Sequence, residues 1–264
     1  MKILFKEKEI SFESIGEGST IVFLHGFMEN RLMWNAFSNT LSKKFNVITI
    51  DLPGHGESEV VAPVQSMELM ADAVKAVLDT LEIKKCMLVG HSMGGYISLA
   101  FADMYPDMMS GLVLFHSHAM EDSEQVKKNR ERTANIIEKD SVGYISMFIP
   151  DLYAKKNIER CSEEIERQKK FAKDMPKQGI IASLLGMKTR TDKLKLLSQI
   201  DIPVLFIAGK QDSRIPLEKM MKQVAVPKYA ELVLFADAGH MSWIEEETTT
   251  VKALSSFAER MLLH

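Results

Sequence analysis

Residues 86–95 read C-M-L-V-G-H-S-M-G-G, an apolar run that passes into a glycine-rich turn around Ser92. The run Met87 to Val89 is typical of a buried strand, and residues 93–104 have the apolar spacing of a helix. A serine at a sharp turn between strand and helix has a strained backbone, which small neighbours such as Gly90 permit. The segment therefore predicts a G-x-S-x-G turn that presents the Ser92 hydroxyl as a nucleophile.

The alternation of strand and helix continues on both sides of this segment. Short apolar runs that end in polar or glycine-containing loops predict strands, and residues at helical spacing lie between them. Such alternation predicts the fold class α/β, with a mostly parallel central sheet and helices on both faces. Strands are expected at 2–6, 9–14, 21–24, 47–50, 87–89, 112–115, 203–208 and 231–235, and helices near 34–41, 70–81 and 93–104, between 208 and 231, and from about 242 onward.

Residues 119–190 interrupt the alternation. They are rich in Lys, Glu and Arg, have the composition of helices and contain no run typical of a strand. The charged run K-K-N-R-E-R at 127–132 is interpreted as a solvated helix face. We therefore predict a core domain formed by residues 1–118 and 191–264, with a helical cap inserted at 119–190.

Composition argues against several classes of protein. With 264 residues, of which 46% are hydrophobic, the chain suits one large α/β domain. A formal charge of -3 without long blocks of one sign makes nucleic acid an unexpected partner. The first ten residues are too charged for a signal peptide and no run is long enough to cross a bilayer, so we expect a cytoplasmic protein without membrane insertion. Cys86 and Cys161 form neither a metal-spaced pair nor a disulfide framework.

His240 is the predicted general base. A serine hydroxyl is too weakly acidic to attack an acyl carbon unaided, so a base must lie within hydrogen-bond reach. His240 lies in a glycine-containing loop between the last strand run and the last helix. Ser242 and Glu245 have the S-x-x-E spacing of a capping box, which predicts that this helix begins directly after the loop. The histidines to which we give structural roles are His25, His55 and His91.

Asp212 is the predicted carboxylate that orients the base. In folds with this serine turn the chain order is Ser, then Asp or Glu, then His, and Asp212 satisfies it. It follows a strand run directly, where a loop at the carboxyl edge of the sheet should lie. Asp122 is a rival, but it belongs to a charged helical run. Asp237 is too close to His240 in sequence.

Two backbone N–H groups are expected to hold an oxyanion. Met93 N–H begins the helix after Ser92, where unpaired N–H groups and the positive end of the helix dipole lie. The second donor should come from the loop H-G-F-M at 25–28, which makes Phe27 N–H the candidate.

Five segments together resemble the α/β-hydrolase superfamily: H-G-F at 25–27, D-L-P-G-H-G-E-S at 51–58, G-H-S-M-G-G at 90–95, G-K-Q-D at 209–212 and G-H-M at 239–241. The resemblance covers nearly the whole chain apart from the predicted cap. Within the superfamily the sequence is similar to small capped serine esterases and to relatives of the cofactor-free haloperoxidases. That group includes carboxylesterases, lactonases, C–C bond hydrolases and a menaquinone-pathway lyase. The resemblance implies no cofactor and no metal, and the sequence has no G-x-G-x-x-G opening a helix, no phosphate loop and no H-E-x-x-H.

These residues predict a serine hydrolase that cleaves a small-molecule carboxylic ester through an acyl-enzyme intermediate. A shared fold and triad do not fix the substrate, so two alternatives stay open. The same triad could serve a C–C bond hydrolase or a lyase, with the cap carrying the difference. The chain could also be a ligand sensor that turns over slowly. Oligomeric state and substrate preference do not follow from the sequence.

Overall fold

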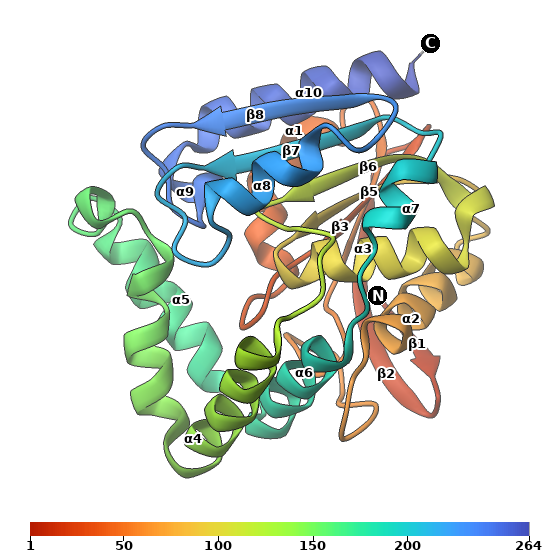
Figure 1. Ribbon diagram of the computed structural model, residues 1–264. Helices are drawn as coiled ribbons and strands as arrows, with labels where there is room; N and C mark the ends of the chain where they lie inside the picture. The colour runs from red at the N-terminus through yellow and green to blue at the C-terminus, as the bar shows by residue number, and fades with distance from the viewer. Residues whose placement is uncertain (264) are drawn as a thin grey trace.

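An eight-stranded sheet runs through the computed structural model, which describes residues 1–263 (Figure 1). The strand order is β1-β2-β4-β3-β5-β6-β7-β8. The pairs β1–β2 and β2–β4 are antiparallel and the other five pairs are parallel, which confirms the mostly parallel sheet. The strands are β1 Lys2–Phe5, β2 Lys8–Ile15, β3 Thr20–Leu24, β4 Asn46–Ile50, β5 Cys86–His91, β6 Met109–Phe115, β7 Val204–Gly209 and β8 Ala230–Phe235.

The central strands are buried along their whole length. Every residue of β3, β5 and β7 is buried, because helices cover the sheet on both sides. Parallel strands covered in this way read as continuous apolar runs instead of alternating patterns. This is why the short runs ending at Leu24, Val89 and Ala208 identify strands in the sequence.

Helices lie on both faces of the sheet, as predicted. Figure 1 shows α3 (Met93–Met104) and α8 (Leu217–Val224) in front of the sheet and α1 (Asn35–Leu41) behind it, where α1 contacts α10 (Glu247–Leu262). On the front, α2 (Met67–Thr80) packs against α3. The short α7 (Leu194–Gln199) precedes β7, and η1 (Arg31–Trp34) and η2 (Pro106–Met108) are single turns.

The segment between β6 and β7 contains helices and, among residues 116–203, no strand. Besides α7, its helices are α4 (Glu124–Phe148), α5 (Ser162–Asp174) and α6 (Lys177–Thr189), with the turns η3 (Pro150–Leu152) and η4 (Lys155–Asn157). Figure 1 shows α4 and α5 standing away from the sheet on the side toward which the arrows of β7 and β8 point. The helices expected for residues 119–190 are therefore present, and the division of the chain into core and cap stays a prediction.

A helix begins at Ser242, directly after the loop of His240, as predicted, but the predicted capping box is wrong. Ser242 is the first residue of a short α9 (Ser242–Glu245), and its Oγ bonds with Nε2 of His116 at 2.8 Å instead of capping the helix. Glu245 accepts the N–H of Gly239 at 2.8 Å. The helix then breaks at Glu246 before α10 begins, so the serine and the glutamate organise the loop around them.

Two further expectations concern the cysteines and the membrane. Cys86 and Cys161 are both free and buried, as expected for ordinary thiols. Within residues 1–263, no helix has both the length and the apolar character that a bilayer span requires.

Replacing Gly94 with alanine should destabilise the fold strongly. A Cβ at Gly94 would lie 2.3 Å from the backbone oxygen of Leu24, so strand β3 and helix α3 would have to separate. We expect Gly94→Ala to lower the free energy of unfolding by about 3 kcal/mol, measured by urea denaturation. Gly111→Ala is the control, because its Cβ would first meet the mobile end of Met87 at 2.9 Å. Equal losses in the two variants would contradict this account.

Candidate active site

Ser92 lies at the tip of β5, between the strand and α3, as the sequence predicts. Its backbone has φ 50° and ψ −111°, a conformation that residues other than glycine rarely adopt. Hydrogen bonds fix this strained turn, since Ser92 N–H donates to Phe115 O at 2.8 Å and Ser117 Oγ donates to Ser92 O at 2.8 Å. The strand-to-helix turn therefore holds Ser92 in one position.

The structure places Asp212 against His240. Asp212 follows β7, and its Oδ1 accepts the N–H groups of Arg214 at 2.7 Å and Ile215 at 2.8 Å. Its Oδ2 lies 2.8 Å from Nδ1 of His240 and 2.9 Å from Nδ1 of His116. The carboxylate thus has four partners and little freedom to move.

These contacts determine the tautomers of the two histidines. A carboxylate only accepts hydrogen bonds, so each Nδ1 that faces Asp212 carries a proton. Nε2 of neutral His240 then has a free lone pair and can accept a proton. Nε2 of His116 accepts the hydroxyl proton of Ser242 at 2.8 Å.

His116 is a site residue that the sequence did not reveal. It is fully buried directly after β6, with φ 48°, and shares the carboxylate oxygen of Asp212 with His240. The available signal is its position, because it follows a strand run and must reach the carboxyl edge of the sheet. His116, Asp212 and His240 are also close enough to hold a metal ion. However, the Nδ1 atoms of both histidines are hydrogen-bonded to Asp212, so the three side chains satisfy one another without a metal ion.

Asp212 is anionic at neutral pH. Burial opposes its ionisation, but His240 and the hydrogen bonds from both histidines outweigh burial and hold the pKa of Asp212 well below its ordinary value. A buried anion at this position stabilises positive charge on His240 when that ring takes up a proton.

One cavity of about 240 Å³ contains both Ser92 and His240. Among the described residues there is no hydrogen bond between Ser92 Oγ and His240 Nε2, and such bonds are often long before a substrate binds. Tyr144 and Phe148 from α4 and Leu184 from α6 line the same cavity. The helical segment between β6 and β7 therefore encloses the serine from outside the sheet.

Phe27 and Met93 carry the two N–H groups that are predicted to hold an oxyanion. Phe27 lines the same cavity and Met93 is the next residue after the serine; neither N–H has a protein acceptor in the part of the chain that the structure describes. Glu29 braces the loop, because its Oε2 accepts Gly26 N–H at 2.7 Å and contacts His91 Nδ1 at 2.8 Å. Glu29, like His116, is a site residue that was not predicted from the sequence.

The loop that carries His240 is attached to the helical segment. His240 N–H donates to Leu152 O at 2.7 Å, and Glu245 Oε1 accepts Ala154 N–H at 2.8 Å. The ring of His91 lies behind the same loop, with its Nε2 3.0 Å from His240 O. Residues 152–154 thus help to hold the imidazole in place.

The alternative carboxylates have other partners. Asp122 is paired with Arg130 and with Arg190, the latter at 2.6 Å. Asp237 is exposed and pairs with Lys156. Asp212 is therefore the carboxylate that the fold brings to His240.

Burial keeps several histidines neutral. It lowers the pKa of His25 and His116 to about 4, although hydrogen bonds act in the opposite direction, and it lowers the pKa of His55 and His118 to about 3. His25 Nε2 accepts Leu52 N–H at 3.0 Å and its Nδ1 lies 2.8 Å from Gly26 O, which gives it the structural role expected of it.

These histidines should make the fold sensitive to acid. In the folded protein the pKa values of these histidines lie below 6.5, their value in the unfolded chain. At a pH between the folded and unfolded pKa values, the unfolded chain therefore binds more protons than the folded protein. Stability is complete above about pH 7 and falls as the pH decreases, by at most about 2 kcal/mol per histidine between pH 6.5 and 5. His91 acts in the opposite direction: burial lowers its pKa, but Glu29 outweighs burial and raises it. Urea unfolding at both pH values measures the difference, and an unchanged free energy would contradict the expectation.

Comparison with known proteins gives the family. Residues 19–247 match the family model described as alpha/beta hydrolase fold. The chain is 28% identical over 256 residues to the AB hydrolase superfamily protein YisY of Bacillus subtilis, covering 93% of this chain and 94% of that protein. It is 28% identical over 268 residues to a 2-hydroxy-6-oxononadienedioate/2-hydroxy-6-oxononatrienedioate hydrolase of Paraburkholderia phymatum, covering 91% and 87%. A solved structure of a thermophilic esterase from Thermogutta terrifontis matches with a TM-score of 0.92 at 33% identity, over 97% of this chain and 94% of that one. The chain belongs to the α/β hydrolase fold family.

Proposed function

We propose that this protein is a serine hydrolase that cleaves a small-molecule carboxylic ester through an acyl-enzyme intermediate. The observation that supports it most is the position of Ser92, strained at the tip of β5, in one cavity with an imidazole that Asp212 holds. The similarity to an esterase over 97% of the chain supports the same substrate class. We also propose that residues 119–190 act as the cap over this cavity.

The proposed mechanism gives each of these residues one role. Ser92 Oγ attacks the ester carbonyl carbon while Nε2 of His240 takes its proton, and Asp212 stabilises the imidazolium that forms. The N–H groups of Phe27 and Met93 donate to the oxyanion. His240 then gives the proton to the departing alcohol. A water molecule attacks the acyl group with His240 as base, and the carboxylic acid leaves.

A second candidate is hydrolysis of a carbon–carbon bond by the same residues. The observation that favours it is the similarity to the 2-hydroxy-6-oxononadienedioate hydrolase, which extends over 91% of the chain. The cavity near Ser92 also contains the basic residues Arg130, Arg214 and Lys219. Arg130 and Arg214 pair with aspartates, whereas no ion pair of Lys219 occurs among residues 1–263. Lys219 is thus available to a carboxylate of such a substrate.

Two measurements test the proposal. A fluorophosphonate reacts with an activated serine, so the labelled peptide should contain residues 86–95. p-Nitrophenyl acetate and butyrate, together with the dienedioate substrate named above, then identify the reaction class. Ester turnover without dienedioate turnover supports the esterase, and the reverse result supports the second candidate. Labelling elsewhere, or none, would refute both.

A further inference from the structure

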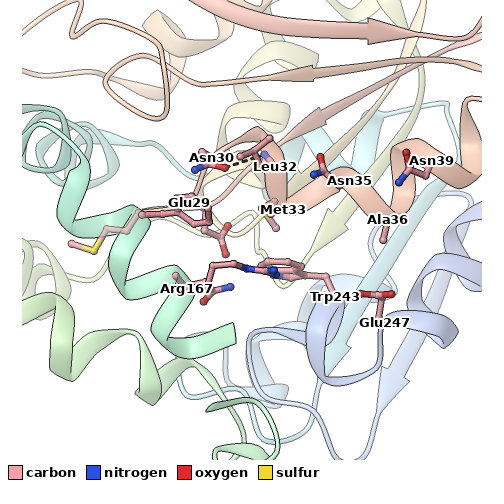
Figure 2. A pocket seen from close by; sticks show the side chains of 13 residues that line it. Glu29, Asn30, Leu32, Met33, Asn35, Ala36, Asn39, Arg167, Trp243 and Glu247 are labelled. Atoms are coloured by element: carbon pink, nitrogen blue, oxygen red, sulfur yellow. Dashed lines mark hydrogen bonds between the residues drawn. The ribbon is translucent and has the colours of Figure 1, made fainter. Parts of the chain in front are cut away.

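A second cleft lies behind the loop that carries Phe27. It has a volume of about 410 Å³ and is formed by the loop after β3, by η1 and α1, by α5, and by the start of α9 and α10 (Figure 2). Neither Ser92 nor His240 lines it. Glu29 borders both this cleft and the cavity of Ser92, and so separates the two.

Three buried polar groups at this cleft have no hydrogen-bond partner within residues 1–263. They are Oε1 of Glu29, Nε2 of Gln168 and Nε1 of Trp243, and each of these residues is only 8% exposed. Figure 2 shows the Glu29 carboxylate beside the Trp243 indole. A buried polar atom without a partner costs free energy, and folded proteins contain few of them. Three such atoms on residues that line one cleft single it out as a candidate ligand site.

The other polar atoms of two of these side chains are already bound, which fixes their orientation. Oε2 of Glu29 holds Gly26 N–H and His91, as described above. Oε1 of Gln168 accepts the hydroxyl proton of Tyr153 at 3.1 Å. What remains is one carboxylate oxygen that accepts, together with the amide NH2 of Gln168 and the indole N–H of Trp243, which donate.

The surroundings define the ligand further. Leu32, Met33 and Phe171 supply apolar walls, and the Trp243 ring supplies an aromatic face. Of the charged residues at the cleft, Glu29 is paired with His91 and Arg167 with Glu164, whereas no ion pair of Glu247 occurs among residues 1–263. The charge of the cleft therefore favours a cation over an anion.

We propose that this cleft binds a small organic amine that also carries a hydroxyl or carbonyl oxygen. The ammonium group donates to Oε1 of Glu29, and the ligand oxygen accepts the N–H of Trp243. The apolar part of the ligand packs against Phe171 and the indole ring. Because Glu29 also holds Gly26 and His91, the occupied cleft contacts the residues that brace Phe27 and Ser92.

The experiment uses 2-amino-1-phenylethanol as the probe, with 1-phenylethanol and mandelate as neutral and anionic probes of similar size. The chain has two tryptophans, so in Trp34→Phe all tryptophan emission comes from Trp243. Titrating this variant with the amine should give a saturable change in emission. Calorimetry on the wild type should give the affinity order amine, then alcohol, then mandelate.

Variants test the contacts. Trp243→Phe keeps an aromatic ring but removes the N–H donor, and should weaken binding of the amine about 3- to 10-fold. Phe171→Ala, at a position that is 37% exposed, should weaken it through loss of the apolar wall. Trp34 is the matched control, because its Nε1 is also buried without a partner but does not line the cleft, so Trp34→Phe should bind like the wild type.

Ser92→Ala should bind the amine with unchanged affinity, which separates this cleft from the cavity of the serine. The proposal is overturned if calorimetry detects no binding of the amine to the wild type, if Trp243→Phe binds as well as the wild type, or if mandelate binds as tightly as the amine. Loss of binding in Ser92→Ala would overturn it too, since the probe would then occupy the catalytic cavity.

Discussion

Ser92→Ala is expected to lower kcat for a short p-nitrophenyl ester by about 10⁴- to 10⁶-fold. The alanine has no oxygen to form the acyl-enzyme, while the cavity and the N–H groups of Phe27 and Met93 are unchanged. The rate that remains is that of direct attack by a water molecule on the ester bound in the same cavity. Steady-state kinetics with active-site titration of the wild type measures the loss.

Ser98→Ala is the matched control for this variant. Ser98 lies in α3, the helix that follows Ser92, is fully buried and donates to Gly94 O at 2.8 Å, so its loss tests the packing of α3 without touching the nucleophile. We expect a stability loss of about 1 kcal/mol and nearly normal turnover. If Ser92→Ala kept turnover within about tenfold of the wild type, the covalent mechanism would be excluded.

Asp212→Asn is expected to lower kcat by about 10⁴-fold. The amide has nearly the same shape, but it has one acceptor oxygen where the carboxylate has two, and four donors converge on this side chain. The amide NH2 must then face either the two backbone N–H groups or the two imidazoles, and where it faces the imidazoles at least one ring changes its tautomer or loses its bond. If that ring is His240, its Nε2 is protonated and cannot act as a base.

Stability should change together with activity in this variant. The folded pKa of Asp212 lies below its ordinary value of 3.8, so the carboxylate stabilises the fold above that pH and this contribution is lost as the pH falls. The difference between wild type and Asp212→Asn should therefore shrink in acid. Asp237→Asn, in an exposed ion pair close to His240 in sequence, should have normal kinetics. Equal kinetic effects in the two variants would assign the orienting role elsewhere.

The fold could be predicted from the sequence because its signals are local. The strands of the central sheet are buried on both faces, so short apolar runs such as Ile21–Leu24 identify them without knowledge of their neighbours. The turn at Ser92 likewise requires small residues within a few positions of the serine. The chain order of Ser92, Asp212 and His240 was sufficient to select residues that the sheet brings to one edge.

The supporting residues could not be predicted because their contacts are distant in sequence. His116 meets Asp212 across 96 positions and Glu29 meets His91 across 62. No rule of sequence spacing connects such pairs. Their contacts depend on which strands are neighbours in the sheet and on how far each loop extends from it. The capping box failed for the same reason, since the hydroxyl of Ser242 bonds with His116, a residue of another strand end.

The bonds from residues 152–154 to the loop of His240 limit how a substrate can enter. If these turns moved outward as a lid, they would pull on His240 N–H and on Glu245, and the base would leave its place beside Asp212. An opening that keeps the base in position has to use other parts of the covering helices. The non-helical residue Asp140 divides α4 into two pieces, and neither piece contains a residue that makes these bonds.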